Sequence, residues 1–255
     1  VAVLTSIGIE HVEYLGHTVE EIAAEKLAIL DEDSFLVSGN VPPSVVEMAA
    51  AAARERGSRW FHLGTDFRIA AAQPAVGGWL VDIEGAEDAY PDVHLTLHGR
   101  HQIDNFAVAA AAVEALLGRP LDADAVREAA TAVTVPGRME IAGRDPLILL
   151  DGAHNPHGAA SLGKAIAEEF PTLQWRLVVG AMKDKDLEGI LEPLRGRIAG
   201  VEAAAAGADR AADAGEVAAI ATRVLDAPAT PHDSVAAAVE AATASGDMPE
   251  RSSGA

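Results

Sequence analysis

The stretch from Leu147 to Gly158 constrains this chain more than any other. An apolar run, Leu147-Ile148-Leu149-Leu150, ends on Asp151, and a short loop then leads to Asn155-Pro156. Asparagine suits the N-cap of a helix and proline suits its first turn, so the stretch predicts a strand, a loop and a helix. Carboxylate, imidazole and amide groups gathered there can bind an anionic or nucleotide ligand. The alternative is a polar turn with a good cap, because motifs this short also occur by chance.

Composition limits the class of protein. The chain has 255 residues, of which 49% are hydrophobic, and this is enough for two modest domains with real cores. It contains no cysteine, which excludes disulfides and thiolate metal sites. A formal net charge of −20 opposes binding to nucleic acid or to anionic membranes. With no long apolar run and no signal peptide pattern, we expect a cytoplasmic, monomeric protein without nucleic-acid or membrane partners.

The first half of the chain alternates strands and helices. A capping box, Thr18-Val19-Glu20-Glu21, predicts a helix through about Leu30, and a second boxed helix is expected from Pro43 to Gly57. Strands are expected around these helices, at residues 1–9, 35–38 and 59–63. This order predicts a parallel sheet covered by helices, whereas the short alternating runs of residues 64–97 predict antiparallel hairpins.

Lys26 is expected on the apolar face of the first helix. Ile22 precedes it by four residues, and Ile29 and Leu30 follow it by three and four, so its stem leaves from that face. Exclusion of water favours the neutral amine, which can condense with CO₂ to a carbamate. The alternative is a lysine that extends its charged end into water at a domain edge.

Two amide side chains precede an alanine-rich helix. Residues 99–105 are expected to form a loop before a helix over residues 106–117. Gln102 and Asn105 could read a base edge or fix a phosphate from that loop. Asn105 could equally serve only as the cap of the helix.

The second half begins with a turn that presents an arginine. Pro136-Gly137 predicts a tight turn before Arg138, a setting typical of arginines that bind phosphate. A hinge is expected at Gly143–Pro146. Strands and helices then alternate as in a small doubly wound unit. Such a unit is expected to end with a further strand, and no segment of the sequence fits it. The expected domains are residues 1–144 and 145–245, followed by a disordered tail over residues 246–255.

With these motifs in order, the sequence resembles the folylpolyglutamate synthase / dihydrofolate synthase family, within the Mur ligase superfamily. The resemblance implies an α/β fold, in which part of a Mur ligase central ATP-binding domain precedes a small Rossmann-like C-terminal ligase domain. The motifs that carry it are Thr5-Ser6-Ile7-Gly8-Ile9-Glu10-His11, Glu25-Lys26, His101-Gln102 with Asn105, Pro136-Gly137-Arg138, Asp151-Gly152-Ala153-His154-Asn155-Pro156, and Gly180-Ala181-Met182 with Asp184-Lys185-Asp186.

The resemblance also implies an activity and site residues. Such ligases use ATP to phosphorylate a carboxylate of dihydropteroate or a reduced folate, and L-glutamate then displaces phosphate to form an amide. By resemblance, Lys26 and His154 are the catalytic residues. Lys26 would be carbamylated, His154 would contact nucleotide or glutamate, and His11 would ligate Mg²⁺. The ATP would be held by Gln102, Asn105, Arg138, Asp151 and Asn155.

The sequence departs from this family in three places. It contains no Gly-x-x-x-x-Gly-Lys-[Ser/Thr] loop. The family's upstream acidic metal ligand and its closing strand are absent as well. We therefore expect a fragment that shows little ATP-dependent ligation alone. Two alternatives stay open, namely a Mur ligase of peptidoglycan synthesis and a non-catalytic nucleotide-binding remnant.

Overall fold

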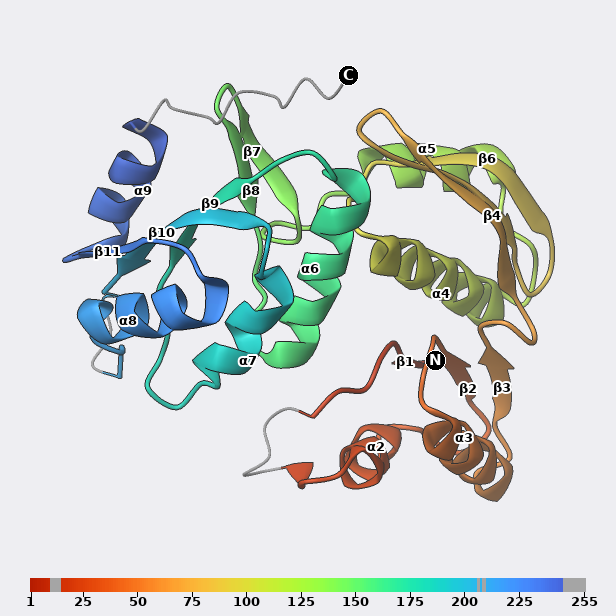
Figure 1. The fold of residues 1–255 in the computed structure, drawn as a ribbon. Helices are drawn as coiled ribbons and strands as arrows, with labels where there is room; N and C mark the ends of the chain where they lie inside the picture. Colours follow the sequence, from red (N-terminus) through yellow and green to blue (C-terminus); the bar gives the residue numbers. More distant parts are fainter. Residues whose placement is uncertain (10–14, 206, 208–209, 245–255) are drawn as a thin grey trace. The chain divides into compact units, whose positions relative to one another are not determined.

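The chain forms two compact units, Val1–Pro136 and Gly137–Ala255, in a computed structural model that describes residues 1–9, 15–205, 207 and 210–244 (Figure 1). The division falls after Pro136 and not after residue 144, because residues 140–144 pair with the next strand of the second unit. The tail over residues 246–255 lies outside the described residues. Within the described part, no helix is both long enough and apolar enough to cross a membrane.

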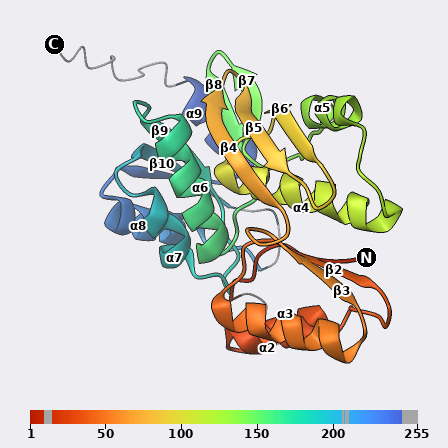
Figure 2. The same ribbon diagram turned by 90° about the vertical axis from the view of Figure 1, so that its right-hand side faces the viewer.

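The first unit contains the predicted parallel sheet. Its strand order is β1-β2-β3, with β1 (Ala2–Leu4), β2 (Phe35–Ser38) and β3 (Arg59–His62). Helices α2 (Val19–Leu27) and α3 (Pro43–Glu55) lie on one side of the sheet, and α4 (Arg100–Leu117) lies on the other (Figure 2). The central strand serves both layers, because Leu36 is buried with α2 and α3 whereas Val37 is buried with α4.

Only one of the two expected capping boxes is present. Thr18 Oγ1 accepts the N–H of Glu21, and Glu21 Oε2 accepts the N–H of Thr18, both at 3.2 Å, so the first box is confirmed. The second is wrong, because α3 begins after Pro42 without a side-chain cap. Ser44 instead donates to Glu20 Oε1 at 2.6 Å. This hydrogen bond holds the pKa of Glu20 below its ordinary value.

The predicted hairpins form a second sheet in the first unit. Its antiparallel strands are β4 (Arg68–Ala75), β5 (Gly78–Glu84) and β6 (Ala89–Leu95). Helix α5 (Ala123–Ala132) packs on β6. Asp122 is its N-cap, and the Asp122 carboxylate accepts two backbone N–H groups of the first turn. The sheet, α4 and α5 share one apolar core, which includes Trp79, Val81, Ile83, Val93, Leu95, Ile103, Ala107 and Val126.

A buried carboxylate, that of Glu114 on α4, ties this core together. The side chain is fully buried and accepts hydrogen bonds from the Tyr90 hydroxyl at 2.5 Å and from the N–H of Ala86 at 2.7 Å. The Tyr90 oxygen in turn accepts the N–H of Leu121 at 2.9 Å. Glu114 lies against Gly85 so closely that an added Cβ there would be 2.7 Å from Oε1. One carboxylate thus joins α4, the β5–β6 turn and the segment before α5.

Tyr90 is expected to titrate far above an ordinary tyrosine. Burial and the hydrogen bond to Glu114 raise its pKa from the usual 10.0 to about 12. Because the folded-state pKa is the higher one, this contribution to stability is fully present below the unfolded-state pKa and is lost as the pH rises through about 12. In a Tyr14→Phe variant, Tyr90 is the only tyrosine left. Ultraviolet titration of that variant should give a midpoint near 12, and a midpoint near the usual 10.0 would contradict the prediction.

The second unit begins with a hairpin. Strands β7 (Glu140–Arg144) and β8 (Leu147–Leu150) pair antiparallel. The expected hinge at Gly143–Pro146 is therefore wrong, because Gly143 and Arg144 belong to β7 and Asp145-Pro146 forms the turn of this hairpin. The apolar run of β8 therefore does not open the parallel sheet, as the doubly wound pattern had predicted. That sheet has the order β11-β10-β9, with β9 (Trp175–Val179), β10 (Ile198–Ala204) and β11 (Ala229–His232).

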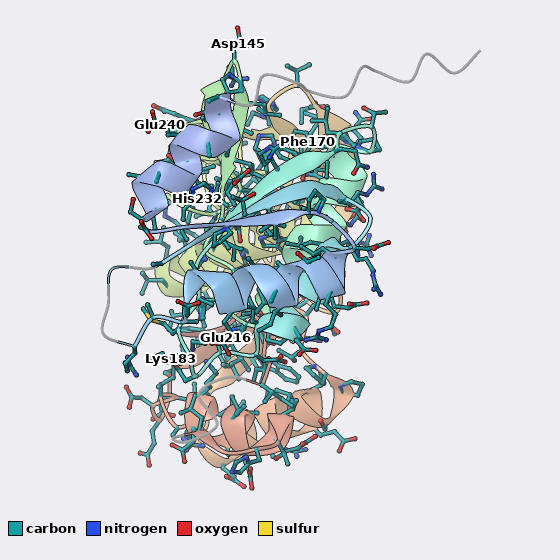
Figure 3. The ribbon with its side chains drawn as sticks, turned by 60° about the vertical axis from the view of Figure 1, so that its left-hand side comes forward. Asp145, Phe170, Lys183, Glu216, His232 and Glu240 are labelled. Atoms are coloured by element: carbon teal, nitrogen blue, oxygen red, sulfur yellow. The ribbon has the colours of Figure 1, made fainter. Side chains whose placement is uncertain are left out.

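Helices pack around this sheet. Helix α8 (Ala214–Leu225) and helix α9 (Val235–Ala244) lie on opposite sides of the strands (Figures 1 and 3). Helix α6 (Pro156–Glu169) follows β8 and packs against α7 (Leu187–Leu191) and the 3₁₀ helix η1 (Glu192–Leu194). Gly163 of α6 faces the backbone of Pro193, and an added Cβ would collide with its carbonyl group. This approach is possible because glycine has no side chain.

Strand β11 was missed from the sequence. It is four residues long and contains Pro231, which lowers strand propensity but is tolerated at a sheet edge. A buried carboxylate, Glu202 on the central strand, pairs with both neighbouring strands. Its Oε1 accepts from Arg176 Nη1 on β9, and its Oε2 lies against His232 Nε2 on β11, each at 2.7 Å. Figure 3 labels His232 at the end of β11.

Candidate functional site

The loop between β8 and α6 has the strand, loop and helix form that the sequence predicted. Asn155 caps α6, because its Oδ1 accepts the N–H of Gly158 at 2.8 Å. His154 is exposed, and its Nδ1 lies 2.9 Å from the carbonyl oxygen of Gly152. A carbonyl can only accept, so Nδ1 carries the hydrogen and Nε2 is left to contact a ligand. The loop thus presents an imidazole beside the positive end of the α6 dipole.

Asp151 joins this loop to the turn that contains Arg138. Its Oδ1 accepts the N–H of Ala153 at 2.8 Å, and its Oδ2 accepts the N–H of Met139 at 2.9 Å. Both carboxylate oxygens are therefore used to fix the backbone. The nucleotide contact expected of Asp151 stays a prediction, but the geometry gives this side chain a clear positioning role.

Arg138 extends from a turn that is fixed on both sides. Before it, Gly137 has a φ of +66° and donates its N–H to Glu140 Oε2 at 2.8 Å. After it, Met139 is held by Asp151, as described above. Arg138 itself is exposed, and no ion pair involving it occurs among the described residues. An exposed guanidinium with free donors suits an anion such as phosphate.

Lys26 lies at the end of its helix. It is half-buried, and Ile22 and Leu30 are buried as expected, but Ile29 is 63% exposed. The predicted apolar position of Ile29 is wrong because α2 ends at Leu27 and Ala28 is its C-cap, so helical spacing no longer applies. Carbamylation of Lys26 stays a prediction.

Gln102 and Asn105 belong to a helix and not to a loop. Helix α4 begins at Arg100, and its N-cap is Gly99 with a φ of +89°. Both the predicted loop and the alternative of capping by Asn105 are therefore wrong. Gln102 is buried, and its Oε1 accepts the Asn105 Nδ2–H at 3.0 Å. The polar side chains of residues 100–105 suggested a loop. The helix nevertheless extends to Arg100, because Gln102 and Ile103 form a buried face in its first turn. Their contacts with a nucleotide stay predictions.

His11, the expected Mg²⁺ ligand, lies outside the described residues. Within the ranges that are described, no group of three or more histidine, aspartate or glutamate side chains is placed to hold a metal ion. The described residues therefore do not by themselves form a metal site.

The two units match two domains of one family. Residues 1–113 match the Mur ligase middle domain, and residues 137–248 match the domain described as Mur ligase, glutamate ligase domain. The chain belongs to the Mur ligases. In this Mur ligase, Arg138 and the whole loop from Asp151 to Gly158 lie in the glutamate ligase domain.

Curated proteins similar to this chain are named as dihydrofolate synthases and folylpolyglutamate synthases. The dihydrofolate synthase/folylpolyglutamate synthase of Mycobacterium tuberculosis (strain ATCC 25618 / H37Rv) is 39% identical over 207 residues, which are 76% of this chain and 42% of that protein. The structure of Mycobacterium tuberculosis folylpolyglutamate synthase complexed with ADP matches with a TM-score of 0.87 and 34% identity, over 95% of this chain and 55% of that chain.

A second solved structure agrees. E. coli FolC in complex with DHPP and ADP matches with a TM-score of 0.80 and 27% identity, over 95% of this chain and 55% of that chain. This Mur ligase spans a little under half the length of the curated relatives it matches.

Proposed function

We propose that this Mur ligase belongs to a folylpolyglutamate synthase / dihydrofolate synthase. Such an enzyme is an ATP-dependent amide ligase that adds L-glutamate to the carboxylate of dihydropteroate or a reduced folate. The observation that carries the proposal is the exposed Arg138, fixed against the Asp151–Gly158 loop within a glutamate ligase domain. Solved relatives with a similar fold are complexed with ADP. A monomer in the cytoplasm is part of the same proposal.

The reaction asks for positive charge near phosphate oxygens. The γ-phosphoryl group of ATP passes to the substrate carboxylate, and ADP leaves. The amine of glutamate then attacks the acyl carbon, the amide C–N bond forms, the bond to phosphate breaks, and the amine releases protons. Arg138 would neutralise phosphate charge in both steps. His154, with Nε2 facing solvent, would contact the nucleotide or the incoming glutamate.

The remaining roles follow from the resemblance to the family. We propose that Gln102, Asn105, Asp151 and Asn155 contribute to nucleotide binding, the last two by fixing the loop. His11 would bind Mg²⁺, and a carbamylated Lys26 would help to order that metal site. When bound, Mg²⁺ would supply charge neutralisation at the phosphates.

Two other functions have less support. A Mur ligase of peptidoglycan synthesis is not favoured, because the similar curated relatives act on folates by name. A non-catalytic nucleotide-binding remnant would bind ATP without Mg²⁺-dependent turnover, and this separates it from a ligase.

The function is tested by ADP release. This chain is assayed alone and fused to the segment of the Mycobacterium tuberculosis relative that precedes the matched region. We expect the fusion to release ADP only when glutamate and either dihydropteroate or a reduced folate are both present. Release that requires a UDP-muramoyl substrate would favour the peptidoglycan alternative. ATP binding with no substrate-dependent release from a folded fusion would favour the remnant.

A further inference from the structure

Gly152 lies directly beneath the guanidinium of Arg138. An ideal Cβ built on Gly152 would collide with Arg138 Nη1, and Cζ would lie only 3.5 Å from it. The nearest backbone atom, the carbonyl oxygen of Gly137, is 3.3 Å from the same point. The space that a side chain at residue 152 would fill is therefore occupied mainly by the end of the arginine.

Backbone conformation does not explain this glycine. Gly152 is absent from the glycines with a left-handed φ, in contrast to Gly137 in the neighbouring turn. An alanine could therefore adopt the backbone of residue 152 without strain. A Cβ would make one tight backbone contact, with the Gly137 carbonyl oxygen at 3.3 Å, which a shift of a few tenths of an ångström relieves. Its main effect would be on the flexible tip of Arg138, which can move away at little cost to stability.

We propose that Gly152 is a positioning residue for Arg138. Glu140 and Asp151 fix the backbone on either side of the arginine. Gly152 then leaves room for the guanidinium to lie over residue 152, at the start of the loop between β8 and α6. A methyl group at residue 152 lifts the guanidinium off the loop. The consequence for nucleotide binding rests on the proposed function, in which Arg138 contacts phosphate.

The position of the arginine can be tested without any ligand. The ¹⁵N–¹H signal of Arg138 Nε, assigned by its loss in Arg138→Lys, reports the surroundings of the guanidinium. We expect Gly152→Ala to shift this signal while the thermal midpoint stays within about 2 °C of the parent. Gly207→Ala is the matched control, because Gly207 is not among the glycines with a left-handed φ, and within the described part of the chain no atom beyond its own neighbours lies within 4 Å of an added Cβ. An unchanged Arg138 signal in Gly152→Ala would overturn the proposal.

Binding of ADP tests the consequence. Arg138→Ala should weaken ADP about tenfold or more, the usual scale for losing a charge-assisted hydrogen bond. Gly152→Ala should weaken ADP by up to the same factor, but should add nothing in the Arg138→Ala background, because there is no guanidinium left to displace. An equal loss in both backgrounds would refute action through Arg138. If the Nε signal shifts but neither variant weakens ADP, the positioning role stands and the phosphate role given to Arg138 in the proposed function fails.

Discussion

Replacement of Glu114 by alanine is expected to destabilise the first unit by about 3–5 kcal/mol. The N–H of Ala86 and the hydroxyl of Tyr90 would both lose their acceptor inside the core. Each buried donor left unsatisfied costs about 1–3 kcal/mol, and the lost side chain leaves a cavity as well. The loss would be read as a lower urea midpoint for protection of the β5, β6 and α4 amides in pulse-labelling hydrogen exchange.

Two variants serve as comparisons for Glu114→Ala. Glu114→Gln keeps the volume but turns one acceptor into a donor, so we expect a smaller loss of about 1–3 kcal/mol. Glu128→Ala removes an exposed glutamate from α5 and should change stability by no more than about 0.5 kcal/mol. Equal midpoints for Glu114→Ala and Glu128→Ala would show that the buried carboxylate does not hold this core together.

Replacement of Gly163 by alanine should destabilise the second unit. The added Cβ meets the carbonyl group of Pro193, with the carbonyl carbon at 3.0 Å, and a backbone obstacle cannot rotate away. Overpacking costs about 1–3 kcal/mol, and we expect the upper end here. The gain of about 1 kcal/mol in helix propensity on replacing glycine offsets only part of it. A net loss of about 2 kcal/mol should lower the thermal midpoint and the exchange protection of α6.

Lys164→Ala provides the control for Gly163→Ala on the same helix. Lys164 is exposed, and its nearest acid, Glu168, lies 3.9 Å away. Loss of such a surface pair costs at most about 0.5 kcal/mol. If Gly163→Ala were as stable as Lys164→Ala, the close approach of α6 to η1 would not depend on the absence of a side chain.

Local chemistry predicted much of the fold. The capping box at Thr18 and the short strand at Phe35–Ser38 each depend on neighbours in the chain, and both were predicted. Features decided by distant partners were missed. Strand β11 exists because it pairs with β10, and only the pairing of β7 with β8 shows that Gly143–Pro146 is the end of a strand and a hairpin turn and not a hinge.

The site shows the same division. The form of the loop from Asp151 to Gly158 follows from Asn155 and Pro156, which are adjacent in sequence. The role of Asp151 in holding Met139, and of Gly152 beneath Arg138, depends on contacts across twelve or more residues. The sequence around Gly152 gives no indication that the absence of a side chain there makes room for Arg138, which lies fourteen residues earlier.

The place where the chain passes from one unit to the other has a mechanical consequence. The first unit ends at Pro136, and Arg138 is anchored through Met139 to Asp151 in the second unit. Arg138 is therefore fixed to the second unit. When that unit moves as a whole, Arg138, His154 and the start of α6 travel together and keep their spacing. A displacement of the second unit would therefore move these groups as one set and not one by one.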